Sequence, residues 1–446
     1  MCLLFLPIDT FRTFEDNNHA CCGFIGTGTC INNGKSLLFK HRWLDEINQR
    51  PIFFNGTNYT FWGIGDGVNS FCRMGLNEKG LSIANFDPPV DDINDDLWEF
   101  ISDHSSKSED YDMMAVLGNF SNVSDAAYWL ANHASYPCQW IIISAEPGVG
   151  AVVAMDYNYH SNISWINDTW ASIGNNWFCE IYQDSWYINR IKYLISYRIK
   201  NNLMYDQFQS DKIGLRDLIR TIGKDQNASD LNHSWFSEPK PDFYSGNYNT
   251  DGIAGWRSCH ASIAVISGDE EYGGLTATAW ISFADTTPLG IYLPLGSSYV
   301  KNSDDIYFRW LADNTRGLQQ YTDIKKNYVE VSNHVYDRSR MHDLQNYSNP
   351  IENFTFDAYE EFLNGLSYSL SDLDIKYRLK YFCDVFAEIG LRFYIKSNSI
   401  SYNKYDINFD GKVGLIDFSL SFIHILKNED YDMMAVLGNF SNVSDA

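Results

Sequence analysis

The chain has 446 residues, of which 45% are hydrophobic and 16% aromatic, a composition that supports a folded core spread over two or three domains of ordinary size. Its formal net charge of −24 argues against nucleic acid as a partner, because the chain would repel phosphate. No internal apolar run reaches the length of a membrane span, so we expect a chain that does not cross a membrane.

The first eight residues are mostly apolar. They resemble the hydrophobic part of a secretory signal without its basic start, and a frayed first strand is the alternative. We therefore expect residues 1–20 to be the remnant of a signal or propeptide in a secreted or cell-surface protein. Acceptor sequences for N-linked glycans permit export, although a chain this rich in Asn and Ser also produces them by chance; they include those that begin at Asn55, Asn58, Asn119, Asn162, Asn227 and Asn353.

The first strand-like run begins with a cysteine. Residues 21–28 are followed by a turn that contains Gly34 and by a second apolar run at 36–42, which predicts a β-hairpin. If cleavage exposes Cys21 as a new amino terminus, its α-amino group titrates at about 7.7–8.0 and can act as the base for its own thiol. The alternatives for Cys21 are a buried strand cysteine or one half of a disulfide.

The nine cysteines do not indicate a disulfide scaffold. If Cys2 leaves with a signal and Cys21 is a nucleophile, seven remain, and seven cannot all pair. The sequence has no Cys-x-x-Cys and no Cys/His cluster of the kind that binds zinc.

Further strands and helices are predicted in separate blocks. Helices are expected within 111–133, as a pair whose second member has its cap at Ser124, and at 185–200. Because the strands do not alternate with helices, the pattern favours an α+β fold built from antiparallel hairpins. The strands are expected at 81–87, 140–145, 150–155, 170–173, 261–266, 275–283 and 290–295.

The region from 304 to 397 is predicted to be mostly helical. Its apolar side chains recur near a helical period, which predicts that they pack in a core; they are Phe362, Leu366, Leu373, Tyr377, Leu379, Phe382 and Phe386.

Residues 406–417 have the spacing of a calcium loop. Oxygen-bearing side chains stand at loop positions one, three, five and twelve, Gly411 stands at six, and the carbonyl of position seven is a ligand; the predicted ligands are Asp406, Asn408, Asp410, Lys412 and Asp417. We expect a structural Ca²⁺ here, with an empty turn as the alternative. A loop that ends in Asp417 resembles a dockerin repeat, which implies a cohesin-like partner, although dockerins carry two such loops and one is visible here.

The end of the chain repeats an earlier segment. Residues 109–126 reappear as 429–446, where the second copy stops in the first turn of what is a helix in the first copy. We interpret 429–446 as a recombination scar or an assembly join and expect 428–446 to be disordered.

The opening hairpin and the segments that follow resemble the N-terminal-nucleophile (Ntn) hydrolases of the choloylglycine hydrolase, penicillin V acylase and isopenicillin N acyltransferase group, over about residues 21–300. In that group the turn glycine lies thirteen positions after the nucleophile, and Gly34 lies thirteen after Cys21, which favours Cys21 over Cys22. The group has a basic residue and an aspartate near the end of the second strand. This chain has Lys40, His41 and Arg42 there, and Trp43 stands where the aspartate is expected, so Asp45 replaces that aspartate only if the strand bulges.

The resemblance also implies other site residues. Residues 75–81 match the family's turn before the strand that carries an oxyanion-hole asparagine, which maps to Asn85. A second active-site asparagine maps to Asn176, with Asn175 as the backup, and an assisting arginine maps to Arg190. His260, in the segment that opens a late strand, is expected to be an ordinary strand residue.

The resemblance implies a four-layer αββα Ntn-hydrolase sandwich that needs no cofactor for catalysis and acts on a small acyl-amide or peptide-like substrate. The expected domains are 1–20 (signal or propeptide), 21–300 (hydrolase), 301–400 (helical extension), 401–427 (calcium loop and helix) and 428–446 (duplicated tail). The alternative hypothesis is a non-catalytic cell-surface binding or scaffold protein with a decayed hydrolase domain, which Trp43 favours.

Overall fold

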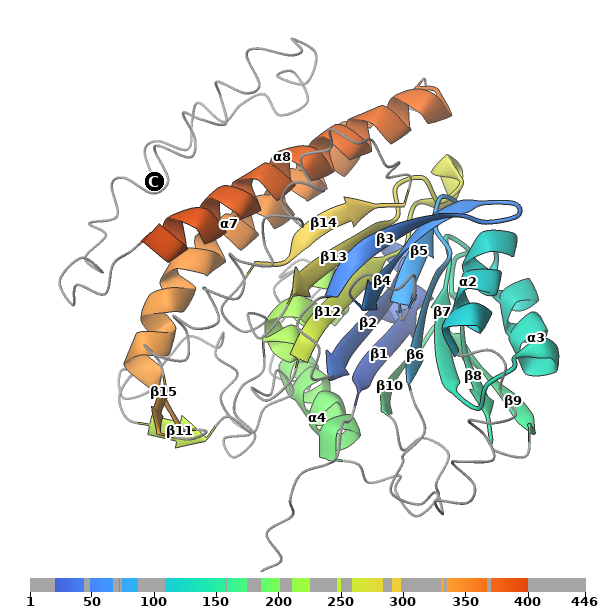
Figure 1. Cartoon of the computed structure of the whole chain (residues 1–446), viewed down its shortest axis with the longest axis horizontal. Helices are drawn as coiled ribbons and strands as arrows, with labels where there is room; N and C mark the ends of the chain where they lie inside the picture. Colours follow the sequence, from blue (N-terminus) through green and yellow to red (C-terminus); the bar gives the residue numbers. More distant parts are fainter. Residues whose placement is uncertain are drawn as a thin grey trace, which may run out of the picture.

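The computed structural model describes residues 21–43, 49–66, 72, 74–86, 109–156, 159–174, 186–200, 211–224, 247–249, 259–283, 291–297, 330–332, 335–366 and 370–399. Two antiparallel sheets face each other, with helices on both outer sides (Figure 1). The predicted α+β class with antiparallel hairpins is confirmed.

The first sheet has six strands in the order β10-β1-β2-β12-β13-β14. The predicted hairpin supplies the second and third of these strands, and β1 is paired on both sides, with β10 and with β2. The bounds are β1 (Cys22–Thr27), β2 (Ser36–Trp43), β10 (Trp170–Gly174), β12 (Cys259–Ile266), β13 (Thr278–Phe283) and β14 (Leu293–Gly296).

The turn of that hairpin needs left-handed backbone. Asn33 and Gly34 have φ of 59° and 67°, conformations that Gly adopts freely and Asn tolerates better than most residues. Gly34 therefore has the turn role that its spacing from Cys21 predicts.

The second sheet is a seven-stranded meander in which every strand pairs with the next along the chain. Its bounds are β3 (Gln49–Asn55), β4 (Thr60–Asp66), β5 (Met74–Asn77), β6 (Ser82–Phe86), β7 (Gln139–Ile143), β8 (Val149–Met155) and β9 (Ser161–Asn167). A small third sheet consists of β11 (Asn247–Asn249), β15 (Glu330–Ser332) and β16 (Val335–Asp337).

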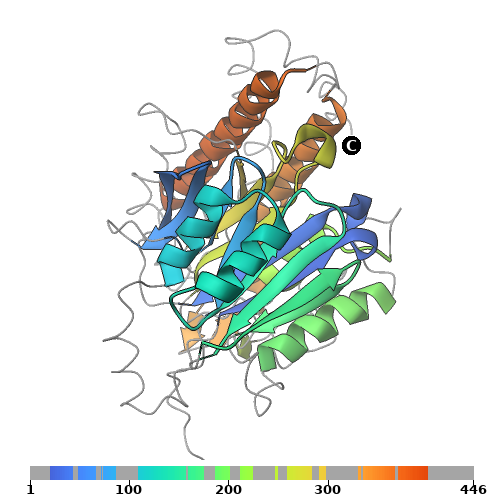
Figure 2. The ribbon, with the colours of Figure 1, turned by 90° about the vertical axis from the view of Figure 1, so that its right-hand side faces the viewer.

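Two helices cover the seven-stranded sheet: α2 (Glu109–Asn119) and α3 (Val123–His133), which lie in front of the strands in Figure 2. The six-stranded sheet is covered by α4 (Trp186–Lys200), α5 (Leu215–Leu218) with the π-helical turn Ile219–Gly223, α7 (Arg338–Asn364) and α8 (Asp372–Ser399). In the described chain no helix is long and apolar enough to cross a membrane.

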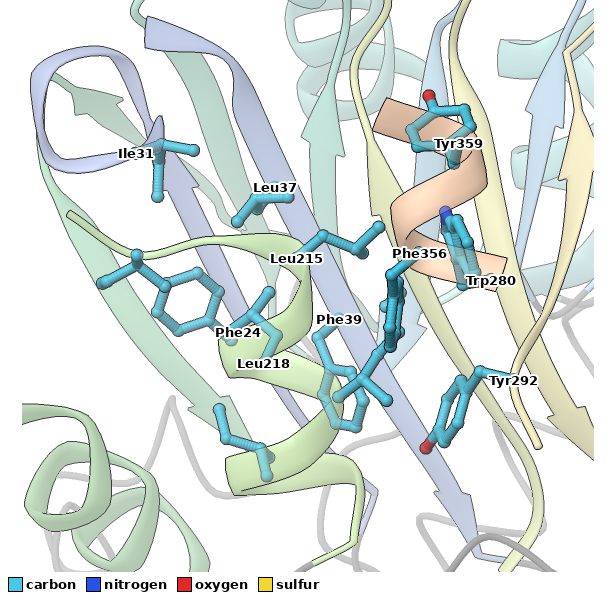
Figure 3. Packing of buried hydrophobic residues seen from close by; sticks show 14 of the residues in the cluster. Phe24, Ile31, Leu37, Phe39, Leu215, Leu218, Trp280, Tyr292, Phe356 and Tyr359 are labelled. Atoms are coloured by element: carbon cyan, nitrogen blue, oxygen red, sulfur yellow. The ribbon is translucent and has the colours of Figure 1, made fainter. Parts of the chain in front are cut away.

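Three apolar clusters follow from this layering, because successive side chains of a strand point to opposite faces. Ile25 and Leu38 belong to the cluster between the sheets, whereas their neighbours Phe24 and Phe39 belong to the cluster under the helices. Figure 3 shows Phe24 and Phe39 beside Leu218 of α5, and Trp280 beside α7. The third cluster joins the outer face of the seven-stranded sheet to α2 and α3.

Two details of the sequence prediction are wrong. The cap of α3 is Asn122, whose side chain accepts from the backbone N–H of Asp125, so Ser124 lies inside the helix. Leu373 and Tyr377 are 59% and 63% exposed, so they do not belong to the core that contains Phe362, Leu379, Phe382 and Phe386, and Leu366 packs only at its edge. Ile375 lies between them in the same turns of α8 and is 2% exposed, so Leu373 and Tyr377 lie on the side of the helix that faces solvent.

Candidate active site between the two sheets

Cys21 directly precedes β1 and is 5% exposed. It belongs to the cluster between the sheets, together with Trp62 and Phe86, whereas Cys22 belongs to the cluster under the helices. Cys21 is a free thiol. The two adjacent cysteines therefore differ in surroundings, and Cys21 is the one in the layer between the sheets.

A lysine joins the two sheets close to Cys21. Lys40 Nζ on β2 donates to Asn85 Oδ1 on β6 at 2.6 Å, and the two residues are 2% and 1% exposed. In the hairpin Lys40 is paired with Gly23, two residues after Cys21. A buried ammonium is unfavourable unless it is paired, so this bridge is the kind of feature that marks functional sites.

Phe86 holds the end of β6 against β1. A Cβ atom on Gly23 would lie 2.5 Å from Phe86 Cζ and 2.5 Å from the carbonyl oxygen of Phe39, so a side chain here would need the ring or the strand to move. Lys40 Nζ also lies 5.5 Å from the centroid of the Phe86 ring. Gly23 thus lets the segment that carries Asn85 approach the strand that follows Cys21.

The two residues after Lys40 are also buried. Burial lowers the pKa of His41 to about 3, and its ring stacks on Phe39 with centroids 6.2 Å apart, so His41 is neutral at physiological pH. Alternation along β2 places Arg42 on the same face as Lys40 and Leu38, which is the face between the sheets. The resemblance points to Lys40, His41 and Arg42 together, and the period-two spacing of Arg42 from Lys40 is the signal that places these two on one face.

The remaining predicted site residues are not brought together by the described structure. Arg190 lies in α4 and His260 lies in β12, but the structure describes only the backbone of these two residues. Asp45, Asn175 and Asn176 lie outside the described residues, as do the five predicted calcium ligands at 406–417.

Among the described residues, no three His, Cys, Asp or Glu side chains gather in a way that would hold a metal ion. A shallow open hollow is lined by Lys79, Asn122 and Glu146. It lies near the start of β6 and the end of β7, whereas Asn85 lies at the opposite end of this strand pair, so the hollow is separate from the Cys21 site.

No model of a known protein family matches the sequence, and no curated protein matches it. Among solved structures, the N-acylethanolamine-hydrolyzing acid amidase ortholog of Caenorhabditis elegans aligns with a TM-score of 0.35 at 13% identity, over 40% of this chain and 79% of that one. An arginine-to-leucine variant of the conjugated bile acid hydrolase of Clostridium perfringens aligns with a TM-score of 0.37 at 14% identity, over 63% of this chain and 94% of that one.

A cysteine-to-alanine mutant of the same bile acid hydrolase gives a TM-score of 0.37 at 12% identity, over 63% of this chain and 93% of that one. Likeness at these TM-scores and identities carries no conclusion on family or activity, so the function must be argued from the residues of this chain.

Proposed function

We propose that this protein is an Ntn hydrolase or acyltransferase that cleaves linear amide C–N bonds with Cys21 as its nucleophile. The observation that carries the proposal is the free thiol of Cys21, which directly precedes β1 in the layer between the sheets, near the Lys40–Asn85 hydrogen bond that joins the two sheets. The sequence resemblance to cysteine Ntn hydrolases supports the same residue independently of the structure.

In the proposed reaction, residues 1–20 are first removed, which gives Cys21 a free α-amino group. That amine accepts the thiol proton while the sulfur attacks the amide carbonyl, and a C–S bond forms. The same amine then donates the proton to the leaving nitrogen as the C–N bond breaks, which leaves a thioester. Water, or a second amine in the acyltransferase case, attacks the thioester and restores the thiol.

Asn85 is proposed to stabilise the oxyanion. Lys40 Nζ donates to its carboxamide oxygen and so fixes the orientation of the side chain, and the amide nitrogen Nδ2 is the donor that we propose for the oxyanion. One such donor is worth about 3–4 kcal/mol in comparable acyl-transfer chemistry. Asn176 is proposed as the second carboxamide, Arg190 as an assisting cation, and Asp45 as the group that holds the new amine; these three roles come from the sequence resemblance.

The test combines processing with activity. We expect the amino-terminal sequence of the mature protein to begin at Cys21, and C21A to lower hydrolysis of an acyl-amide panel by at least about 10³-fold. C22A is the matched control, because it removes the neighbouring buried thiol from the helical side and is expected to keep activity. A mature chain that retains residues ahead of Cys21, or a C21A variant with wild-type turnover, would reject the proposal.

Trp43 favours the second candidate function, a non-catalytic surface protein with a decayed hydrolase domain. It is the last residue of β2, at the position where the resemblance calls for an aspartate. A mature protein that begins at Cys21 but forms no thioester with any acyl-amide would support this candidate.

The calcium-binding and docking proposal rests on the sequence of the 406–417 loop alone. Titration calorimetry of the full chain with Ca²⁺ is expected to show one site, which D410A removes without changing amide hydrolysis. A cohesin-like partner is proposed only for the Ca²⁺-loaded form. Wild-type heats indistinguishable from those of D410A would exclude both proposals.

A further inference from the structure

Gln139 is a fully buried polar residue without a visible structural role. It is 0% exposed, and neither Oε1 nor Nε2 has a hydrogen-bond partner in the described structure. Buried carboxamides are almost always hydrogen-bonded, because an unmet donor or acceptor in a dry environment is unfavourable. Each exception calls for an explanation, and a ligand that supplies the missing partners is one.

The strand pattern shows which way Gln139 faces. Along β7, Ile141 and Ile143 belong to the cluster between the sheets, whereas Trp140 and Ile142 belong to the outer cluster under α2 and α3. Gln139 stands two residues before Ile141, so its side chain lies on the face between the sheets.

The neighbours of Gln139 place it at the Cys21 end of the sandwich. Its partner across the ladder is Phe86, whose ring packs against Gly23 and lies beneath the ammonium of Lys40. Strand β7 also contacts β1 and β2 across the space between the sheets. The unmatched carboxamide and the Cys21 thiol therefore occupy the same layer at the same end of the fold.

We propose that Gln139 binds the N–H of the substrate's scissile amide through Oε1, while Nε2 donates to an oxygen elsewhere on the substrate. This inference rests on the proposed function and narrows it to secondary amides. In a trans amide the carbonyl and the N–H point in opposite directions. Asn85 is therefore proposed to bind the carbonyl oxygen from one side, and Gln139 to bind the N–H from the other. An ester of the same acyl group has no N–H, so it leaves Oε1 unmet and is discriminated against.

The experiment replaces Gln139 by methionine, which keeps the unbranched shape and removes both polar atoms. We expect Q139M to lower kcat/KM for a secondary amide by about 10- to 100-fold. The amide-to-ester ratio for one acyl group should fall by about 10-fold or more, because the ester never used Oε1. The melting temperature should rise by roughly 2 °C, because an unpaired buried group is gone.

Thr221→Val is the matched control. The Thr221 hydroxyl is also buried without a partner, but it lies in the π-helical turn on the helical side, and valine has nearly the same shape. We expect the same direction of change in melting temperature and an unchanged amide-to-ester ratio. A purely structural role for Gln139 predicts that Q139M behaves like this control, or that it is destabilised.

Each outcome gives a decision. Q139M with the wild-type amide-to-ester ratio overturns the inference and leaves the role of Cys21 intact, provided that wild-type hydrolysis is abolished by C21A. Misfolding of Q139M and also of Q139L overturns it as well, because that result gives the carboxamide a structural role. A wild-type protein without Cys21-dependent turnover overturns both the inference and the proposed function.

Discussion

The two polar atoms of the Asn85 side chain have different proposed roles: Oδ1 accepts from Lys40 and contributes to stability, and Nδ2 is the proposed donor in catalysis. We expect N85D to keep an oxygen for Lys40, now as a buried ion pair, and so to retain the fold. Because the variant loses the Nδ2 donor, kcat should fall by about 10²–10³-fold. N85A should also lower stability, by about 2–3 kcal/mol, since it leaves the ammonium without this partner. Thermal unfolding and steady-state kinetics check both variants, and an active N85D would contradict the oxyanion role.

His41 makes stability depend on pH. Its pKa of about 3 in the folded state lies below the value near 6.5 expected in the unfolded chain. The unfolded chain therefore binds more protons between these values, so this contribution is complete above pH 6.5 and is lost as the pH falls toward 3. At pH 5 the expected loss is about 2 kcal/mol. Urea unfolding at pH 7.5 and pH 5 should show this loss for the wild type and a correspondingly smaller one for H41F.

The matched control for that measurement is His160→Gln, a change at an exposed ring. If H41F and the wild type lose equal stability between pH 7.5 and pH 5, burial of His41 is not the cause.

At the residue scale, part of the candidate site was predictable. Cys21 and Lys40 stand out because their types are unusual in an apolar hairpin, and the resemblance supplied Asn85. Gln139 was not identified, because a polar residue beside an apolar run becomes informative only when its lack of partners is known. That Lys40 and Asn85 meet is a property of two sheets, which no local pattern contains.

At the element scale, Glu352 ties three separate segments together. It lies fully buried on α7 and pairs with Arg220 at 2.8 Å and Lys224 at 3.0 Å, and it accepts from the backbone N–H of Tyr292 at 3.0 Å. Burial lowers the pKa of Lys224 to about 8, even though Glu352 opposes that change. The helix, the π-helical turn and the approach to β14 thus share one buried carboxylate.

We expect E352Q to lower the free energy of unfolding by about 3–5 kcal/mol, because it removes the carboxylate charge that both buried cations share. Glu360→Gln is the control: Glu360 lies on the same helix, its side chain is mostly exposed, and it is 3.7 Å from Arg216. That change should cost no more than about 0.5 kcal/mol. Urea denaturation of both variants measures the difference, and equal effects would show that the buried cluster does not join these elements.

The elements themselves were predicted best where they are buried. The hairpin, β7, β8 and α4 fall close to their predicted ranges, because apolar runs and helical periods are strong local signals. Strand β9 escaped prediction because it is an edge strand with mostly exposed, polar residues. The cap of α3 was misplaced by two residues because Asn122 and Ser124 are both good capping types.

At the scale of the whole molecule, the helices after residue 337 complete the core. Trp280 on β13 stacks on Phe356 of α7 with centroids 4.6 Å apart and meets Tyr359 edge-on at 5.5 Å (Figure 3). Leu379 of α8 lies so close to Gly296 that a Cβ there would be 2.7 Å from its Cδ2. The sequence predicted the α+β class from its blocks, but not which helices cover which sheet face, since that depends on contacts far apart along the chain.

We therefore expect a chain that ends at residue 337 to expose the part of the six-stranded sheet that α7 and α8 cover, and to aggregate or unfold without a cooperative transition. A chain that ends at residue 400 keeps every described helix and should retain the melting temperature of the full chain. Calorimetry of the two truncations makes the comparison. Cooperative unfolding together with Cys21-dependent turnover in the shorter chain would show that α7 and α8 are dispensable.

Because Cys21 and Cys22 face opposite sides of the sheet, the proposed maturation must cleave the chain at one exact peptide bond. A protease that cuts one bond too late would release a molecule with a thiol and an amine at its first residue, yet with that sulfur among the helices. Such a product would fold, carry the expected chemical groups and remain inert. In any preparation, the fraction of titratable active centres would therefore report the accuracy of the cut rather than the quality of folding.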